Sequence, residues 1–100
     1  MRTDLPSPHQ VVQACHAAIE AARFLLPRHL PHPHLVVCGL PDQRRLFQCM
    51  DHLRRRGVSS RPFYEPDRGD ELTAVATEPV FGDRRKLFRR YHCLDRPGFA

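Results

Sequence analysis

Three histidines lie close together in the sequence, with a spacing at which imidazoles could share a transition metal. They are His29, His32 and His34, in the pattern His-x-x-His-x-His. Neutral imidazole is a common ligand of first-row transition metals. However, Pro31 and Pro33 hold this segment extended, and no fourth ligand lies nearby in the sequence. We therefore expect a solvated connection without a metal, and a metal-binding regulator is the weakest of our three hypotheses.

Basic side chains form two clusters that could contact phosphates. One is Arg54–Arg56, and the other contains Arg84, Arg85, Lys86, Arg89 and Arg90. In a helix, residues four apart share a face, so Arg85 would lie with Arg89. Contacts with four phosphates would give a log–log salt dependence with a slope of about −3 to −4. The alternative interpretation is a solvated face whose charges suit the helix dipole.

The totals agree with a small basic domain. The chain has 100 residues, a net charge of +5 and a pI near 9.6. Such a charge favours polyanions such as RNA or an anionic membrane surface. The four cysteines form no Cys-x-x-Cys pair, and the sequence contains neither a signal peptide nor an apolar run of 18 residues. We expect a cytoplasmic protein with reduced thiols and without a cofactor or a membrane segment.

The first half of the chain predicts helix, strand, helix. A helix is expected from about His9 to Leu26, where Pro27 follows, and its inward stripe is expected to be Val11, Val12, Cys15, Ala18, Ile19 and Ala22. The apolar run within 34–40 suggests a strand buried on both faces. Asp42 is a plausible N-cap for a second helix with Leu46, Met50 and Leu53 inside, and Gly57 is its stop signal.

The second half predicts two strands and a final helix. Residues 58–64 suggest an edge strand, because Pro62 limits its pairing, and it should run parallel to the strand at 34–40 in a βαβ unit. Residues 72–77 alternate like a third, antiparallel strand. Asp83 is expected to cap a helix that ends at Arg90, and residues 91–94 could form a closing extended segment.

Two separated segments together resemble the peptidyl-tRNA hydrolase type 2 family. The first is Thr3-Asp4-Leu5 followed by Gln13-Ala14-Cys15-His16-Ala17-Ala18. The second is Glu65-Pro66-Asp67-Arg68-Gly69 followed by Leu72-Thr73-Ala74-Val75-Ala76-Thr77-Glu78-Pro79. The order of expected elements also agrees with this family, over about residues 2–94. We expect one such domain in residues 1–94 and a loose tail in 95–100.

The resemblance implies a fold and an activity. The fold is α/β, a three-layer α/β/α domain with a small mixed sheet of three to four strands. The activity is hydrolysis of the ester between a peptidyl or acyl group and tRNA, and members often form homodimers. The residues that fall on the family's motifs are His16, Asp67 and Thr73 as the expected catalytic residues, with Gln13 beside them.

The chain also departs from the family. Its glycine- and lysine-rich turn is replaced by residues 6–10, where His9 falls on one of the lysine positions. We expect His9, Gln13, Arg85 and Arg89 to bind the substrate. The family's first strand precedes Thr3, so the true start may lie upstream, the residues before Pro6 may suffice as a short strand, or another chain may fill the place.

Two hypotheses about tRNA remain beside the metal-binding one. In the first, the protein hydrolyses peptidyl-tRNA or a related acyl-tRNA. In the second, which the missing lysine turn favours, it is catalytically impaired and binds tRNA or a ribosomal partner through its arginines.

Overall fold

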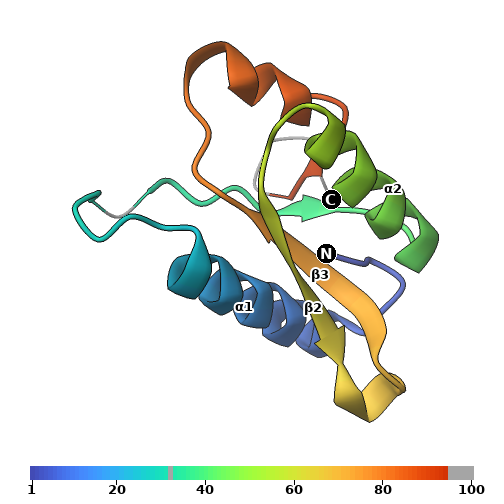
Figure 1. The fold of residues 1–100 in the computed structure, drawn as a ribbon. Helices are drawn as coiled ribbons and strands as arrows, with labels where there is room; N and C mark the ends of the chain where they lie inside the picture. The colour runs from blue at the N-terminus through green and yellow to red at the C-terminus, as the bar shows by residue number, and fades with distance from the viewer. Residues whose placement is uncertain (32, 95–100) are drawn as a thin grey trace.

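The computed structural model describes residues 1–31 and 33–94, which form a mixed α/β fold (Figure 1). In chain order its elements are α1 (Ser7–Phe24), β1 (Cys38–Gly39), α2 (Gln43–Arg55), β2 (Ser60–Glu65), the 3₁₀ helix η1 (Pro66–Arg68), β3 (Glu71–Thr77), the 3₁₀ helix η2 (Gly82–Phe88) and β4 (His92–Cys93). The strands form two antiparallel pairs, β1 with β4 and β2 with β3. The mixed α/β class predicted from the sequence is confirmed.

Helix α1 begins two residues earlier than expected and buries a different face. Pro8 fits its first turn, where proline's missing N–H costs nothing. The buried residues are Gln13, Ala17 and Ala21. The predicted inward stripe is wrong, since Val11 and Ile19 are 64% and 54% exposed. The alanines let α1 approach β2 and β3 closely, and Gln13 finds polar partners there, so packing against the hairpin overrides the apolar periodicity.

The first strand is much shorter than predicted. Only Cys38 and Gly39 pair, with Cys93 and His92. Leu35, Val36 and Val37 are exposed, so the expectation of a strand buried on both faces from residue 34 is wrong. Beyond β1, the carbonyl of Val37 accepts a hydrogen bond from the Leu94 N–H at 2.8 Å, and the two-residue β4 pairs only with Cys38 and Gly39. The closing extended segment predicted at 91–94 is confirmed as β4.

Helix α2 follows the sequence signals closely. The Asp42 carboxylate accepts a hydrogen bond from the backbone N–H of Arg45 at 2.9 Å, which confirms the predicted N-cap. Leu46 and Leu53 are buried against the hairpin, while Met50 is only half-buried. Gly57 ends the helix with a φ of +76°, a conformation that glycine adopts without steric cost.

Strands β2 and β3 form the central hairpin, and the predicted antiparallel pairing is confirmed. Strands β1 and β2 belong to different pairs, so the parallel orientation expected for them in a βαβ unit stays a prediction. Pro62 lies within β2 opposite Val75. Proline has no N–H to donate to a ladder, so a strand that contains it tolerates only one hydrogen-bonded neighbour at that point.

The residues before Pro6 lie between the two strand pairs. The Leu40 N–H donates to the Met1 carbonyl at 2.9 Å, and the Thr3 N–H donates to the Leu40 carbonyl at 2.8 Å. On the other side, the Arg2 N–H donates to the Thr73 carbonyl at 3.2 Å. Arg2 and Leu40 form a parallel β-bridge. This segment therefore behaves as a very short strand, as one of the three alternatives supposed.

The last helical segment is a 3₁₀ helix and not the predicted α-helix. In its final turn the Arg89 N–H donates to the Lys86 carbonyl, and just beyond it the Tyr91 N–H donates to the Phe88 carbonyl. Both bonds have the three-residue spacing of a 3₁₀ helix. Only Leu87 and Phe88 are partly buried, while the basic residues are exposed. With so little apolar area to bury, there is little packing to stabilise a longer helix.

Two further findings complete the fold. Among residues 1–31 and 33–94, no helix is long and apolar enough to cross a membrane. The tail that we expected to be loose, residues 95–100, lies outside the described residues.

Candidate functional site

A chain of polar side chains connects α1 to the end of the hairpin. The Thr73 hydroxyl, which is fully buried, donates to Oε1 of Gln13 at 2.7 Å. Nε2 of Gln13 then donates to the Glu65 carboxylate at 2.8 Å. Because a carboxylate can only accept, this second bond fixes the orientation of the amide and leaves its oxygen facing Thr73. These hydrogen bonds give Gln13 a reason to be buried.

Glu65 joins this chain to the turn that carries Asp67. Its carboxylate also accepts from the backbone N–H of Asp67 at 3.1 Å, and so caps η1. The hydrogen bond from Gln13, followed by that from the Asp67 N–H, lowers the pKa of Glu65, and His16 adds a smaller contribution. Glu65 is therefore ionised at neutral pH. The Asp67 side chain is exposed.

His16 lies at the same end of the hairpin. Its ring stacks on Phe63, with ring centroids 4.3 Å apart and the planes 6° from parallel. Phe63 belongs to β2, and its carbonyl lies 3.4 Å from the Thr73 hydroxyl. His9 is exposed in the first turn of α1. Residues three and four apart share a helix face, so His9, Gln13 and His16 lie along one side of α1.

Arg2 links the N-terminal segment to β3 through its guanidinium group. It is only 6% exposed, and its guanidinium forms two bonds to Asp4, at 2.9 and 2.8 Å, and one to Glu71 at 2.7 Å. The hydrogen bond to Asp4, and then that to Glu71, raise the pKa of the Arg2 guanidinium. In return, Arg2 lowers the pKa values of Asp4 and Glu71. Since its backbone N–H also holds the Thr73 carbonyl, Arg2 connects the N-terminal segment to the polar chain.

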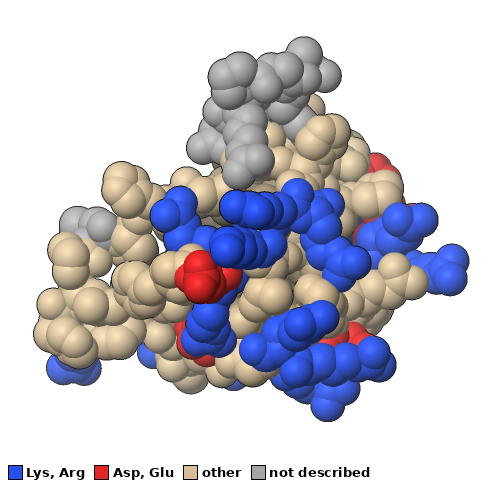
Figure 2. Space-filling view, turned by 90° about the horizontal axis from the view of Figure 1, so that it is seen from above, with Lys and Arg blue, Asp and Glu red and all other residues tan. Residues whose placement is uncertain are grey.

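The expected substrate-binding arginines lie elsewhere. Arg84, in the same 3₁₀ helix as Arg85, donates to the Gly57 carbonyl at 2.7 Å, just before β2 begins. The Asp67 turn follows the other end of β2, whose six residues span about 20 Å. The 3₁₀ helix that contains Arg85 therefore lies near the start of β2, whereas the Asp67 turn lies beyond its end and His16 stacks on Phe63 within it. Figure 2 shows the end of the molecule where basic side chains gather with few acidic ones among them.

Two of the three histidines of the run lie in the described part of the chain. His29 and His34 are exposed, and His32 lies outside the described residues. Over residues 1–31 and 33–94, no group of three potential ligands could hold a metal ion.

No protein-family model matches the chain, and no curated protein or solved structure matches it. The resemblance to peptidyl-tRNA hydrolase type 2 therefore rests on the residues and their arrangement.

The sequence analysis gave no role to three residues that contact Gln13, His16, Thr73 or the Asp67 turn in the structure; they are Glu65, Phe63 and Arg2. Glu65 was read as part of a turn, yet its position directly before a proline is suited to capping η1. Phe63 gave no signal, because a phenylalanine in a strand is usually a core residue. The ion pair of Arg2 with Glu71 joins residues 69 positions apart, and no local pattern in the sequence predicts it.

Replacing Thr73 by valine should lower the free energy of unfolding by about 1–3 kcal/mol, because Gln13 would keep a buried oxygen without a donor. Urea unfolding would measure the loss. Thr73→Ser, which keeps the hydroxyl, should recover at least half of it. If Thr73→Val is as stable as the wild type, the Thr73–Gln13 hydrogen bond contributes nothing to folding.

Proposed function

We propose that the chain is a peptidyl-tRNA hydrolase-like domain that cleaves the ester between a peptidyl or acyl group and tRNA. The observation that carries the proposal is the arrangement at one end of the hairpin. There His16 and the ionised Glu65 lie beside the Asp67 turn, and a buried chain through Gln13 and Thr73 supports them. Ester hydrolysis needs a positioned water, a proton acceptor and donors for the oxyanion.

The residues would divide these tasks. His16 accepts the proton of the attacking water, and Asp67 helps to orient that water. Glu65 lies close enough for its charge to stabilise the imidazolium that forms, since the same attraction lowers the pKa of Glu65. Backbone N–H groups at the start of α1, together with His9, receive the negative charge that develops on the substrate. Thr73 and Gln13 are buried and act as positioning residues.

The proposal includes a three-layer fold. Hydrogen bonds join residues 1–3 to Leu40 on one side and to Thr73 on the other, which supports one mixed sheet containing β1, β3 and β2. Side chains alternate across a strand. The Thr73 side chain bonds to α1, so the buried side chain of Leu72 points to the opposite face, and the packing of α2 against β3 supports a helix on each face.

The test is release of N-acetyl-aminoacyl groups from purified acyl-tRNA between pH 5 and 9. We expect release above buffer by the wild type and a loss of about 100-fold or more for His16→Ala, the usual scale for removal of a general base. His29→Ala, at an exposed histidine of the loop, is the matched control and should keep full activity.

Two results would contradict the ester chemistry. One is no release by the wild type at any pH. The other is equal activity of His16→Ala and His29→Ala, which would place the reaction elsewhere. Homodimer formation, a cytoplasmic location and independence from cofactors stay predictions.

A second candidate is a catalytically impaired protein that binds tRNA or a ribosomal partner. It is favoured by one specific observation: the Thr73 hydroxyl and the Gln13 amide are buried and bonded to each other, so neither faces a substrate. Salt-sensitive tRNA binding without turnover would select this candidate.

A further inference from the structure

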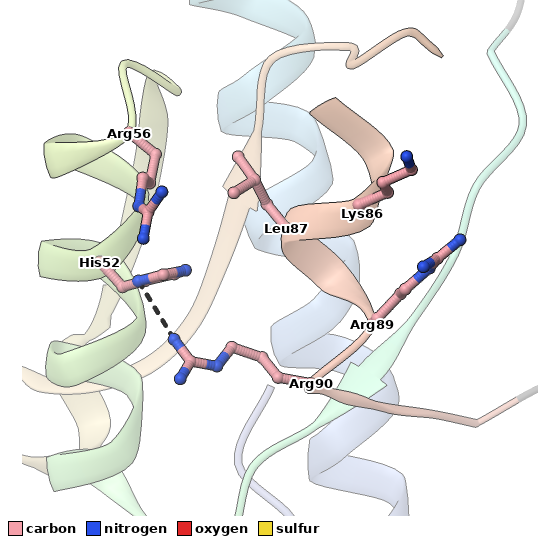
Figure 3. A pocket seen from close by; sticks show the side chains of 6 residues that line it. All are labelled: His52, Arg56, Lys86, Leu87, Arg89 and Arg90. Carbon is pink, nitrogen blue, oxygen red and sulfur yellow. Dashed lines mark hydrogen bonds between the residues drawn. The ribbon is translucent and has the colours of Figure 1, made fainter. Parts of the chain in front are cut away.

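A hollow of about 490 Å³ opens between the last turns of α2 and η2, at the basic end of the molecule. Five of the six residues that line it carry basic nitrogens, and none is acidic; they are His52, Arg56, Lys86, Leu87, Arg89 and Arg90. Figure 3 shows Arg56 and His52 projecting from α2 and Arg90 reaching toward His52. On the other side of the hollow lie Lys86 of η2 and Arg89, which directly follows η2. Two groups of cations thus flank Leu87.

The acidic residues near this end pair with cations, of which only Lys86 lines the hollow. Asp51 pairs with Arg54 and Arg55 at 2.7 and 2.8 Å. Glu78 pairs with Arg84 at 3.6 Å, and Asp83 pairs with Lys86 at 3.3 Å. Within residues 1–31 and 33–94, by contrast, Arg56, Arg89 and Arg90 have no carboxylate within ion-pair distance. Three guanidinium groups of the hollow thus have no carboxylate partner in the described part of the chain.

His52 holds one of these guanidinium groups in place. Nη1 of Arg90 lies 3.1 Å from Nδ1 of His52. Arginine is always protonated and can only donate, so Nδ1 must be the acceptor and the imidazole is neutral in this arrangement. Partial burial, followed by the nearby Arg90, Arg56 and Arg55, lowers the pKa of His52 and keeps the ring neutral near pH 7. The hollow thus contains a guanidinium oriented by a neutral imidazole.

We propose that this hollow binds phosphodiester groups of a nucleic-acid backbone, with Arg56 and Arg90 on one phosphate and Lys86 and Arg89 on a neighbouring one. A guanidinium offers a planar fork of donors that matches phosphate oxygens. Cations on two sides of Leu87 suit a chain of phosphates better than a single small anion. Leu87, half-buried between them, offers an apolar contact to a sugar or base.

This site is separate from the proposed ester site. The hollow is lined by α2 and by residues 86–90, whereas His16 stacks on Phe63 of β2, so the two sites share no residue. Binding in the hollow does not depend on the ester chemistry, so the two proposals can fail separately.

The test is fluorescence anisotropy with a labelled, unstructured 20-nucleotide RNA and the DNA of the same sequence, between 0.05 and 0.3 M salt. The main variant is Arg56→Gln/Arg89→Gln/Arg90→Gln. The variant removes both arginines from one phosphate and one of the two cations from the next, so it should reduce the salt slope by up to about 1.4, at about 0.7 per single-stranded phosphate. If the two proteins bind equally at 1 M salt, that slope change corresponds to an affinity weakened by up to about 25-fold at 0.1 M.

The matched control removes the same charge elsewhere, as Arg23→Gln/Arg28→Gln/Arg44→Gln. These arginines are exposed and do not line the hollow. The control should lose less than about tenfold, because it changes only the general field of the protein. If the main variant does not fold, Lys86→Glu/Arg89→Glu keeps the Arg90–His52 contact and should weaken binding at least as much.

The outcomes separate the alternatives. Equal binding of RNA and DNA supports recognition of backbone phosphates alone, and tighter binding of RNA supports the site and identifies RNA as its ligand. Equal weakening in the main variant and the control would overturn the proposal. Binding of the wild type to phosphatidylserine vesicles but to neither nucleic acid would also overturn it. Normal RNA binding without ester hydrolysis would reject only the catalytic proposal.

Discussion

Replacing Arg2 by methionine should lower the free energy of unfolding by about 3 kcal/mol at pH 7. Arg2 is 6% exposed, and its guanidinium binds Asp4 and Glu71. Removing one partner of a buried ion pair costs about 3–5 kcal/mol, and we expect the lower end because both carboxylates are more than a third exposed. Methionine keeps much of the buried stem volume, so the loss reports mainly on the charge.

The stability difference between the wild type and Arg2→Met should depend on pH. Arg2 lowers the pKa values of Asp4 and Glu71 in the folded protein below their ordinary values of 3.8 and 4.5. A carboxyl whose folded pKa is lowered contributes stability above its unfolded pKa, and this stability is lost as the pH falls through the folded pKa. The difference between wild type and Arg2→Met should therefore be largest above pH 5 and shrink toward pH 2.

Urea unfolding at pH 7 and at pH 3 would measure both parts of this prediction. Arg68→Met is the matched control, because Arg68 is exposed and lies 3.9 Å from the same Glu71, and it should change stability by less than about 1 kcal/mol. Equal stabilities of Arg2→Met and Arg68→Met would show that the buried ion pairs do not hold the N-terminal segment.

The second large effect is expected at Gly39. A Cβ atom at this position would lie 2.6 Å from Cγ2 of Thr3 and 3.2 Å from Cδ2 of Leu94. The first contact is too close for any relaxed structure, and Thr3 is held by its backbone bond to Leu40. Overpacking of this kind costs about 1–3 kcal/mol, and we expect Gly39→Ala to be near the upper value. The loss would be measured by thermal or urea unfolding.

A compensating change makes this prediction specific. Thr3→Ser removes Cγ2 but keeps the hydroxyl that bonds the Leu40 carbonyl at 3.3 Å. The double variant Gly39→Ala/Thr3→Ser should regain most of the lost stability, and Thr3→Ser alone should cost little. Strictly additive effects would show that the clash with Thr3 is not the cause, since contacting residues should couple.

Signals that act within a few residues were read correctly from the sequence. Asp42 caps α2, Gly57 ends it with a positive φ, and residues 58–77 form an antiparallel hairpin around the Asp67 turn. In each case the information is local, because a cap, a stop or a tight turn is decided by nearby backbone geometry. The catalytic and substrate-binding roles that the resemblance gives to Gln13, His16 and Thr73 stay predictions.

Signals that depend on distant partners were misread. The apolar stripe of α1 is the exposed one, because the hairpin accepts the small residues Ala17 and Ala21 and a polar Gln13. The apolar residues Leu35, Val36 and Val37 before β1 are exposed, although their run predicts a buried strand. A helix can bury any face for which a partner surface exists, and periodicity alone does not name that surface.

The sequence by itself determined the small mixed α/β class, the excess of arginine, and the short-range caps, stops and turns that set the order of helices and hairpin. Only the tertiary structure decided that Glu65 connects Gln13 to the Asp67 turn and that Arg2 is buried between two carboxylates. It also decided that His52 meets Arg90 across the basic hollow. These contacts join residues 38 to 69 positions apart, and such closure depends on how the elements pack together rather than on any local preference.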